Sequence, residues 1–323
     1  MEIGSFIGLD LKNSGEFYNG ETDLARLNSA RAGIYHSCRL YNCTSILIPH
    51  YLCPEVRRFL LNHGIEVIPY FISESFEPID ITQKKNQAVL LVNYFGILAL
   101  NKMSEIAGHY QNVIIDNSAA FYADPIVGCY NVYSPRKFFG VPDGCYVIGK
   151  NATKFVDGYQ QDFSSKTATF LMKRLEYSTH ETYNERMVNE DRINQSDILK
   201  MSVLSKSLLM NIDYSSIAEK RSSNYQIAHR IFGKINKYDP SKLSDSRCVP
   251  MIYPFVMEDA DLTERLKSNK IFVGRLWKHV IDDVPDYSIE AFLSRYLDPI
   301  PIDQRYEREH LLFIYDCIVN HHQ

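Results

Sequence analysis

The chain has 323 residues, of which 45% are hydrophobic and 23% are charged, and its formal net charge is −4 at pH 7. These values are typical of a globular protein with a large core, and the mild acidic excess gives no electrostatic reason to expect nucleic acid or anionic membrane as a partner. The longest apolar run, residues 88–100, is too short to cross a bilayer and contains Asn93, so we expect no membrane span.

The N-terminal segment and the cysteines bear on the compartment. The opening MEIGSFIGLDL lacks the basic start and the long apolar run of a secretory signal. Seven cysteines form no C-x-x-C pair, which favours reduced thiols used as small apolar residues. The histidines have no metal-ligand spacing, so no metal is expected. These features predict a cytoplasmic protein.

Strand-like and helical runs alternate over the first half of the chain. Strands are predicted over residues 45–51, 65–71, 88–94, 112–116, 129–134 and 144–150. Helices are predicted over 54–64, where Pro54 begins and Gly64 ends the pattern, and over 97–111. Apolar strands that alternate with helices predict an α/β fold, with a mostly parallel central sheet covered by helices on both faces.

The second half of the chain is organised differently. Residues 160–232 are polar and helical, and the charges of 184–197 are expected on a solvated helix or loop. A linker is predicted at 238–246. Beyond it the pattern predicts a strand, a helix, a strand and a last helix, over residues 247–257, 259–270, 271–277 and 306–321. We therefore expect a large domain at 1–237 and a smaller C-terminal α+β domain at 238–323.

Polar residues follow the predicted strands, at the edge where ligands bind in such sheets. They are Tyr51, Asn93, Asp116, Ser134 and Lys137, in chain order. Four of them have an ordinary alternative: Asp116 could cap a turn, Ser134 could begin one, Tyr51 could be core, and Lys137 could be a surface lysine. Lys137 lies among Pro135, Gly140, Pro142 and Gly144, a backbone frame that a solvated lysine does not need.

Upstream of these strands, small residues open a predicted helix at Ser29–Gly33. A helix N-terminus leaves free backbone N–H groups that suit an anion, and the Arg31 guanidinium could add a bidentate contact to phosphate. A carboxylate at a strand end, a framed lysine and an anion-holding helix start are together what a pyridoxal phosphate enzyme requires. The lysine forms a Schiff base, the carboxylate keeps the pyridine nitrogen protonated, and the helix start holds the phosphate.

At these residues the chain resembles the DegT/StrS-type sugar aminotransferases, which are pyridoxal phosphate enzymes with the fold of aspartate aminotransferase. NSARAGI resembles the family's Ser-Ala-Thr-Ala-Gly turn, and VIIDNSAA resembles its Ile-Glu-Asp-Ala-Ala segment. SPRKFFGVPDGCYVI resembles the segment of the Schiff-base lysine, with Asp143 where the family has glutamate. NYFG resembles the Asn-Pro-Thr-Gly segment of the wider fold.

The resemblance implies a three-layer transferase fold, a homodimer and a role for each residue. Lys137 and Asp116 would be catalytic. The remaining cofactor contacts would come from Ser29, Ala30, Arg31 and Ser134 at the phosphate, Asn93 at the ring hydroxyl and Tyr51 on the ring face. Three positions depart from the family pattern: Arg31 replaces a threonine, Ala119 a glutamine and Ile198 an asparagine.

The implied activity is transfer of an amino group from an amino acid, with glutamate as the expected donor, to a keto-sugar or a similar polar acceptor in amino-sugar or surface-polysaccharide biosynthesis. Whether the acceptor is nucleotide-linked stays open. The alternative is a non-catalytic relative that kept the fold as a binding or scaffold protein. Family dehydratases are disfavoured, because they have histidine where this chain has Lys137. Arg305 could bind a substrate carboxylate or phosphate, although a surface ion pair is the ordinary interpretation.

Overall fold

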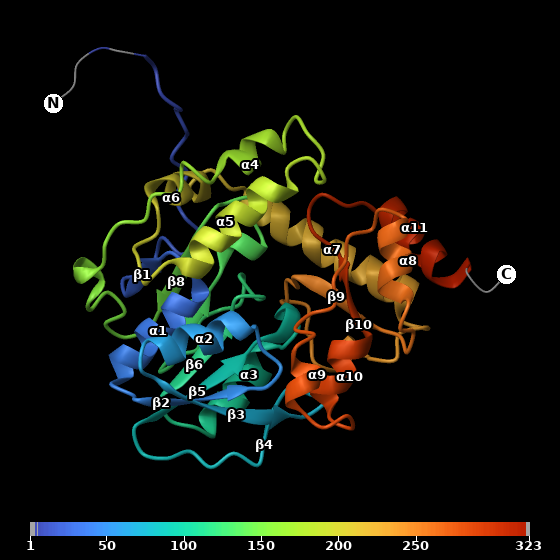
Figure 1. Cartoon of the computed structure of the whole chain (residues 1–323), viewed down its shortest axis with the longest axis horizontal. Coiled ribbons are helices and arrows are strands. Elements are labelled where there is room, and N and C mark those ends of the chain that lie inside the picture. The colour runs from blue at the N-terminus through green and yellow to red at the C-terminus, as the bar shows by residue number, and fades with distance from the viewer. Residues whose placement is uncertain (1–3, 5, 321–323) are drawn as a thin grey trace.

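The computed structural model describes residue 4 and residues 6–320 (Figure 1). Residues 1–3 and 5, on which part of the signal-peptide expectation rests, lie outside the described residues. No helix in the described part of the chain is both long and apolar enough to cross a membrane.

A mixed, mostly parallel sheet of eight strands forms the centre of the molecule, in the order β1-β8-β7-β6-β5-β2-β3-β4. The strands are β1 (Leu24–Leu27), β2 (Ser45–Pro49), β3 (Glu66–Ile72), β4 (Pro78–Ile79), β5 (Gln87–Val92), β6 (Val113–Asn117), β7 (Tyr130–Tyr133) and β8 (Cys145–Ile148). The pairs among β3, β2, β5, β6 and β7 are parallel. β8 is antiparallel to both β7 and β1, and β4 is antiparallel to β3. The prediction of a mostly parallel sheet is therefore confirmed.

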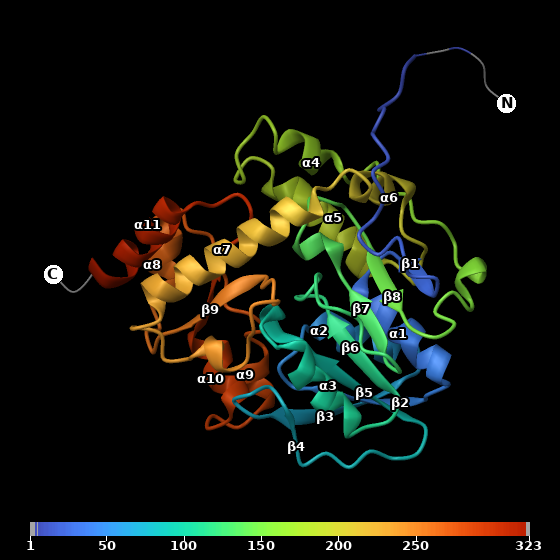
Figure 2. The same cartoon turned by 180° about the vertical axis from the view of Figure 1, so that it is seen from behind.

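Helices cover both faces of this sheet. They include α1 (Ala30–Tyr41), α2 (Pro54–Asn62) and α3 (Leu100–Gly108). Figure 1 shows α1 and α2 in front of the sheet, and Figure 2, seen from behind, shows α3 on the other side. Strands β5 and β6 are buried along their whole length, as expected for strands covered on both faces.

Gly33 lets α1 approach the sheet closely. A Cβ at this position would lie 2.6 Å from Cys145 Sγ, 2.9 Å from Val132 Cγ1 and 3.0 Å from Val147 Cγ2. The first turn of α1 is therefore seated directly on β7 and β8. This contact fixes the helix start beside the strand ends that carry the predicted site.

The polar middle of the chain is helical, as predicted. It contains α4 (Thr169–Lys173), α5 (Tyr183–Gln195), α6 (Val203–Leu209) and α7 (Tyr214–Phe232). Short 3-10 helices occur at η1 (Tyr94–Gly96), η2 (Pro135–Lys137), η3 (Val156–Gly158) and η4 (Pro240–Lys242). Figures 1 and 2 show the long α7 running from the large sheet towards the C-terminal part.

The C-terminal part has its own small sheet and core. β9 (Ile252–Val256) pairs antiparallel with β10 (Leu297–Pro301). The helices are α8 (Leu262–Ser268), α9 (Val280–Asp283), α10 (Ile289–Tyr296) and α11 (Arg308–Val319). The second hydrophobic core joins β9, β10, α8 and α11 to Ala228 and Phe232 of α7, upstream of the predicted boundary at residue 238.

The predicted strand at 271–277 is wrong. This segment forms neither strand nor helix, although Ile271 and Val273 are buried and Phe272 is exposed. Its alternating pattern is strand-like, but among the described residues the small sheet consists of β9 and β10 alone, and the segment pairs with neither. β10 was not predicted.

Candidate functional site

The carboxyl ends of β5, β6 and β7 bring three predicted residues to one edge of the sheet. Val92 pairs with Asp116, and the next backbone N–H, that of Asn93, donates to the Asp116 carbonyl at 3.0 Å. On the other side, Asp116 pairs with Val132, two residues before Ser134. Asn93, Asp116 and Ser134 thus follow adjacent strands of one parallel set.

The Asp116 carboxylate is buried, with 6% of the residue exposed. Its Oδ1 accepts the backbone N–H of Ser118 at 2.8 Å. The Ser118 hydroxyl is also buried and has no hydrogen-bond partner in the described part of the chain. An unpartnered buried hydroxyl beside a buried carboxylate suits a polar ligand at this strand end. Sequence reasoning did not single out Ser118, because a serine two residues after a strand-end aspartate is an ordinary turn residue.

The NYFG segment forms a strained turn against this strand end. Phe95 has φ of 60°, which is rare for a bulky residue, and Gly96 has φ of 74°. A Cβ on Gly96 would lie 2.6 Å from the Ala119 carbonyl oxygen, so only glycine fits this close approach. The Asn93 side chain is committed to the turn: its Nδ2 donates to Asn117 Oδ1 at 3.2 Å, and its Oδ1 accepts the Leu98 N–H at 3.3 Å.

The predicted phosphate turn opens α1. Ser29 is its N-cap and accepts the Ala32 N–H at 3.4 Å, while the backbone N–H groups of Ala30 and Arg31 have no acceptor among the described residues. The Arg31 guanidinium points elsewhere, towards the end of α5. It donates to Asn194 Oδ1 at 3.0 Å and to the Ile193 carbonyl. Burial lowers the pKa of Arg31. The free N–H pair therefore suits an anion more directly than Arg31 does.

Lys137 ends η2 and is exposed, whereas the two residues after it, Phe138 and Phe139, are buried against Phe121. This aromatic packing fixes the backbone of Lys137 and leaves its amine free. Ser134 precedes η2; it is 6% exposed, and its hydroxyl makes no hydrogen bond within the described residues.

Cys53 is the N-cap of α2 and is half-buried. Burial raises the pKa of its thiol, while the nearby positive charges of Lys137 and Arg31 act in the opposite direction. Both cations therefore lie within electrostatic reach of one sulfur atom.

Tyr51 lies in the main hydrophobic core. The residue is fully buried, with its ring 4.5 Å from the Trp277 ring and 5.6 Å from the Tyr94 ring, measured between centroids. Its hydroxyl is buried without a partner in the described chain, and burial raises its pKa. In this arrangement Tyr51 packs within the core, and its predicted contact with a cofactor ring stays a prediction.

Helix α5 corrects one expectation. Its charges were expected on a solvated helix or loop; Arg186 and Asp191 are exposed, but Glu190 and Arg192 contact the surroundings of Lys137. Arg136 forms an ion pair with Glu190, and Asn189 Nδ2 donates to the Pro142 carbonyl at 2.8 Å. The pattern misled because charged side chains on a helix of low apolar content usually face water. Only the tertiary fold brings this helix over the segment around Lys137, residues 135–144, which we call the lysine turn.

A buried ionic cluster continues this contact. Arg192 Nη1 lies 2.6 Å from Asp162 Oδ1, and Arg192 Nη2 lies 3.8 Å from Asp143 Oδ2. Asp143 also accepts the Ser202 N–H at 3.2 Å, which ties the lysine turn to the start of α6. The second carboxylate oxygens of Asp143 and Asp162 and two guanidinium nitrogens of Arg192 are buried without hydrogen-bond partners within the described residues. The cluster therefore has hydrogen-bonding capacity that ordered water could use.

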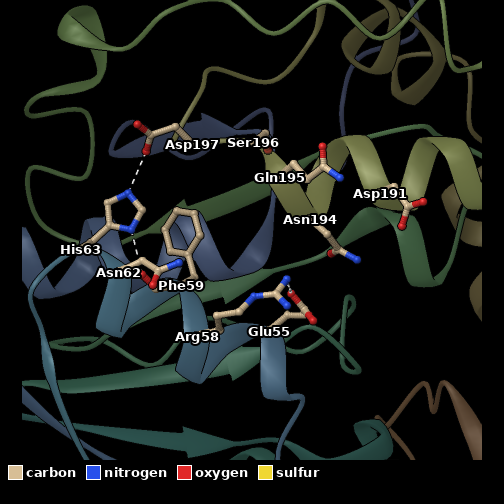
Figure 3. Close-up of a pocket in the computed structure, with 10 residues that line it drawn as sticks. All are labelled: Glu55, Arg58, Phe59, Asn62, His63, Asp191, Asn194, Gln195, Ser196 and Asp197. Atoms are coloured by element: carbon tan, nitrogen blue, oxygen red, sulfur yellow. Dashed lines mark hydrogen bonds and ion pairs between the residues drawn. The ribbon is translucent and has the colours of Figure 1, made fainter.

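Two cavities flank α2. The larger, about 850 Å³, is an open groove between α2 and the end of α5 (Figure 3). It is lined by Glu55, Arg58, Phe59, Asn62, His63, Asp191, Asn194, Gln195, Ser196 and Asp197. His63 bridges its ends, with Nδ1 2.8 Å from the Phe59 carbonyl oxygen and Nε2 2.8 Å from Asp197 Oδ1. The smaller cavity, about 120 Å³, lies on the opposite side of α2.

Arg305 has the ordinary role considered for it. Its guanidinium makes two hydrogen bonds of 2.8 Å to Asp303, so it forms the expected ion pair. Within residues 4 and 6–320, no three histidine, cysteine, aspartate or glutamate side chains gather as a metal-ligand set.

The site residues fit pyridoxal phosphate. The free N–H pair of α1 suits the phosphate, the buried Asp116 suits a cationic ring nitrogen, and the exposed amine of Lys137 is available for a covalent bond.

Comparisons with known proteins agree with the fold. No protein-family profile and no curated protein sequence matches the chain. Several solved structures do match it. The structure of sugar aminotransferase CalS13 from Micromonospora echinospora superimposes with a TM-score of 0.67 at 12% identity, and the match covers 94% of this chain and 88% of the CalS13 chain. DesV from S. venezuelae has 0.62 at 15% identity, with coverage of 93% and 85%. A DegT DnrJ EryC1 StrS aminotransferase from Brucella abortus has 0.61 at 13% identity, with coverage of 94% and 87%. The chain thus has the fold of the DegT/DnrJ/EryC1/StrS sugar aminotransferases.

Proposed function

We propose that this protein is a pyridoxal phosphate-dependent aminotransferase that moves an amino group from an amino acid, with glutamate as the expected donor, to the keto group of a sugar or a similar polar acceptor. One observation carries the proposal: a buried strand-end carboxylate (Asp116), a free amine (Lys137) and an open helix start (Ser29–Ala30) lie along one edge of a sheet with the aminotransferase fold.

Each residue has a role that its surroundings support. When bound, the cofactor supplies an electron sink for the charge left after a substrate proton departs. Lys137 would hold the cofactor covalently and, once displaced by the donor amine, would move a proton between substrate carbon and cofactor carbon. Asp116 would keep the ring nitrogen protonated. Ser29, Ser134 and the backbone N–H groups of Ala30 and Arg31 would anchor the phosphate through both half-reactions.

The groove between α2 and α5 supports a polar acceptor. Its volume of about 850 Å³ is within the range of ligand pockets, roughly 300 to 1,000 Å³. Carboxylates and side-chain amides line it, and these groups hydrogen-bond to hydroxyls. Arg31 connects the groove to the phosphate turn, because it bonds to Asn194 in the groove wall.

A half-reaction experiment tests the proposal. The protein is loaded with pyridoxal phosphate, L-glutamate is added, and the visible spectrum of the bound cofactor is followed before keto-sugars are supplied. Conversion by the amino acid and reversal by a keto-sugar are expected. If the cofactor binds but no amino acid converts it, transamination is wrong. If the protein takes up no cofactor, the non-catalytic alternative is favoured.

We further propose a homodimer. Large apolar side chains are exposed along residues 163–203, namely Phe163, Met172, Leu175, Tyr177, Tyr183, Met187, Val188 and Val203. Exposed apolar side chains concentrated in one segment are typical of an interface. Sedimentation should give a dimer for the wild type and for Val127→Glu, whose valine is 99% exposed elsewhere, and a monomer for Leu175→Glu. A wild-type monomer with full activity would contradict the proposal.

A further inference from the structure

Arg221 of α7 is a buried cation that lies against Phe138, the residue after Lys137. Arg221 is 2% exposed, and its guanidinium carbon lies 4.5 Å from the centre of the Phe138 ring. The nearest oxygens to which it donates in the described chain are neutral, namely Gln304 Oε1 at 3.2 Å and the Met251 carbonyl at 3.1 Å. Burial lowers the pKa of Arg221 to about 10, so the group stays charged near neutral pH. A charged side chain is rarely buried without a paired charge, and here the face of an aromatic ring takes that place.

Gln304, in the segment between β10 and α11, extends this contact to the backbone of the lysine turn. Its Oε1 accepts the Arg221 Nε–H, and its Nε2 donates to the Phe138 carbonyl oxygen at 3.1 Å. Within the turn, the N–H groups of Phe138 and Phe139 both donate to the Pro135 carbonyl, at 3.0 Å and 2.9 Å. The segment that carries the lysine is therefore closed by its own hydrogen bonds and held from outside by one side-chain amide.

Arg221 also reaches the NYFG turn. The Met251 carbonyl accepts from Arg221 Nη1, and the Met251 N–H donates to the Phe95 carbonyl at 2.7 Å. One buried arginine thus contacts the lysine turn directly and the turn after Asn93 through a single residue. Both turns follow strands of the large sheet, whereas Met251 and Gln304 belong to the C-terminal part of the chain. The C-terminal part therefore contributes to the placement of both turns.

We propose that Arg221 and Gln304 are positioning residues, which hold the lysine turn through Phe138 and so fix where the Lys137 amine is presented. The inference rests on the proposed function for its consequence, because the amine must meet a cofactor there. The Lys137 side chain is exposed, so its backbone is the part that the protein can hold. A misplacement of about 1 Å in a reacting group can cost on the order of a hundredfold in rate, which makes such a hold chemically useful.

Gln304→Glu separates the two contacts of the amide. A carboxylate can still accept the Arg221 Nε–H, but it cannot donate to the Phe138 carbonyl. A residue that only anchored Arg221 would therefore keep its role in this variant, whereas the hold on the lysine turn would be lost. Gln226→Glu is the matched control, because it adds the same charge at an exposed position of α7.

Hydrogen exchange measures the turn without any cofactor. The full chain is exchanged in deuterated buffer, and peptides that contain the Phe138 and Phe139 amides are analysed by mass spectrometry. Gln304→Glu should speed exchange at these amides by about tenfold, as for the loss of one hydrogen bond that holds the turn closed. Peptides from β2, and all peptides of Gln226→Glu, should exchange within about twofold of wild type.

Cofactor affinity shows whether the hold acts through the lysine. Binding of pyridoxal phosphate is measured by equilibrium dialysis for wild type, Gln304→Glu, Lys137→Ala and the double variant. Gln304→Glu should weaken binding by about tenfold when Lys137 is present and by less than about twofold when it is absent. A general loosening of the protein would weaken binding equally in both backgrounds.

Arg221→Lys tests the other member of the pair. Lysine keeps the charge but loses the planar group on the Phe138 ring and the forked donors, so the variant should act like Gln304→Glu in both measurements. Arg230→Lys, at an exposed position of the same helix, is its control. An Arg221→Lys protein that matches Arg230→Lys would remove Arg221 from the proposal.

Faster exchange at Phe138 and Phe139, with an affinity loss that requires Lys137, supports the proposal. Exchange in Gln304→Glu that matches Gln226→Glu overturns it, and so does an affinity that changes independently of Lys137 or not at all. If the wild type takes up no pyridoxal phosphate, the proposed function fails separately. The exchange experiment then decides alone whether Gln304 holds the lysine turn: faster exchange supports the hold, and unchanged exchange overturns it.

Discussion

Arg136, the residue before Lys137, forms an ion pair with Glu190 of α5, in which Arg136 Nη2 lies 2.5 Å from Glu190 Oε1. Both side chains are mostly buried, so the pair is better shielded than a surface salt bridge. α5 buries only Asn189 and Ile193, and hence it docks mainly through polar contacts. The helix therefore acts as a polar brace on the lysine turn.

Removing Arg192 should weaken this brace. Arg192→Ala leaves Asp162 and Asp143 buried without their cation, a loss that typically costs about 3 to 5 kcal/mol. Urea unfolding measures the free energy, and the affinity for pyridoxal phosphate should fall as the turn loosens. Arg186→Ala is the control, since Arg186 lies on the same helix, is exposed and should change stability by less than about 0.5 kcal/mol.

Lys137→Ala should abolish the covalent attachment of pyridoxal phosphate without unfolding the protein. The amine is exposed and makes no ion pair with the described residues, so its removal costs little stability. Borohydride reduction followed by mass spectrometry should find the cofactor on Lys137 in the wild type and on no residue in the variant. Lys166→Ala, at another exposed lysine, should label as the wild type does. Labelling of the Lys137→Ala protein at wild-type level would place the attachment elsewhere.

Asp116→Asn should retain the cofactor and slow the half-reaction. Asparagine can keep the hydrogen bond from the Ser118 N–H, so the fold is preserved, while the charge that stabilises a protonated ring nitrogen is lost. The rate should drop by about tenfold to a thousandfold, which corresponds to the pKa shift of about 1 to 3 units that a neighbouring opposite charge produces. Stopped-flow spectroscopy with L-glutamate measures the rate. A wild-type rate in this variant would remove Asp116 from the mechanism.

Gly33→Ala should destabilise the fold through the contact between α1 and the sheet. The added Cβ would lie 2.6 Å from Cys145 Sγ and 2.9 Å from Val132 Cγ1, and overpacking of this kind costs about 1 to 3 kcal/mol. Gly108→Ala, at the end of α3, meets nothing within 4 Å and is the control. Equal unfolding free energies for the two variants in urea would show that the helix can shift without cost.

The stability of the wild type relative to Asp143→Asn should fall as pH rises. Burial raises the pKa of the Asp143 carboxyl, against the hydrogen bonds of Ser202 and Ser205, so the folded state holds this proton to higher pH than the unfolded chain does. The favourable contribution is full below the unfolded pKa, about 3.9, and is lost as pH rises through the folded value. The melting temperatures of both proteins, measured from below the unfolded pKa to above the folded one, give the difference in stability. A constant difference would contradict the burial argument.

Local sequence patterns were sufficient to predict much of the fold. The strands from β2 to β8, apart from the two-residue β4, and the start of α1 at Ser29 follow from apolar runs, prolines and a capping serine, whose effects act within a few residues. The chemical types at Asp116 and Lys137 were visible for the same reason, because the ends of parallel strands meet at one edge whatever the pairing order. Segment 271–277 shows the limit of prediction from local patterns, since a strand needs a partner strand as well as an alternating pattern.

The sequence by itself determined which residues could do chemistry and on which strands and helices they lie. Only the tertiary structure decided what those side chains face. Arg31 turns towards α5, Tyr51 is enclosed by Trp277, and Arg221 lies against the Phe138 ring. These outcomes depend on contacts between residues far apart in the chain, and such contacts leave no periodic trace in the sequence. The physical reason is that backbone preference acts locally, whereas burial and charge pairing are settled when distant elements pack together.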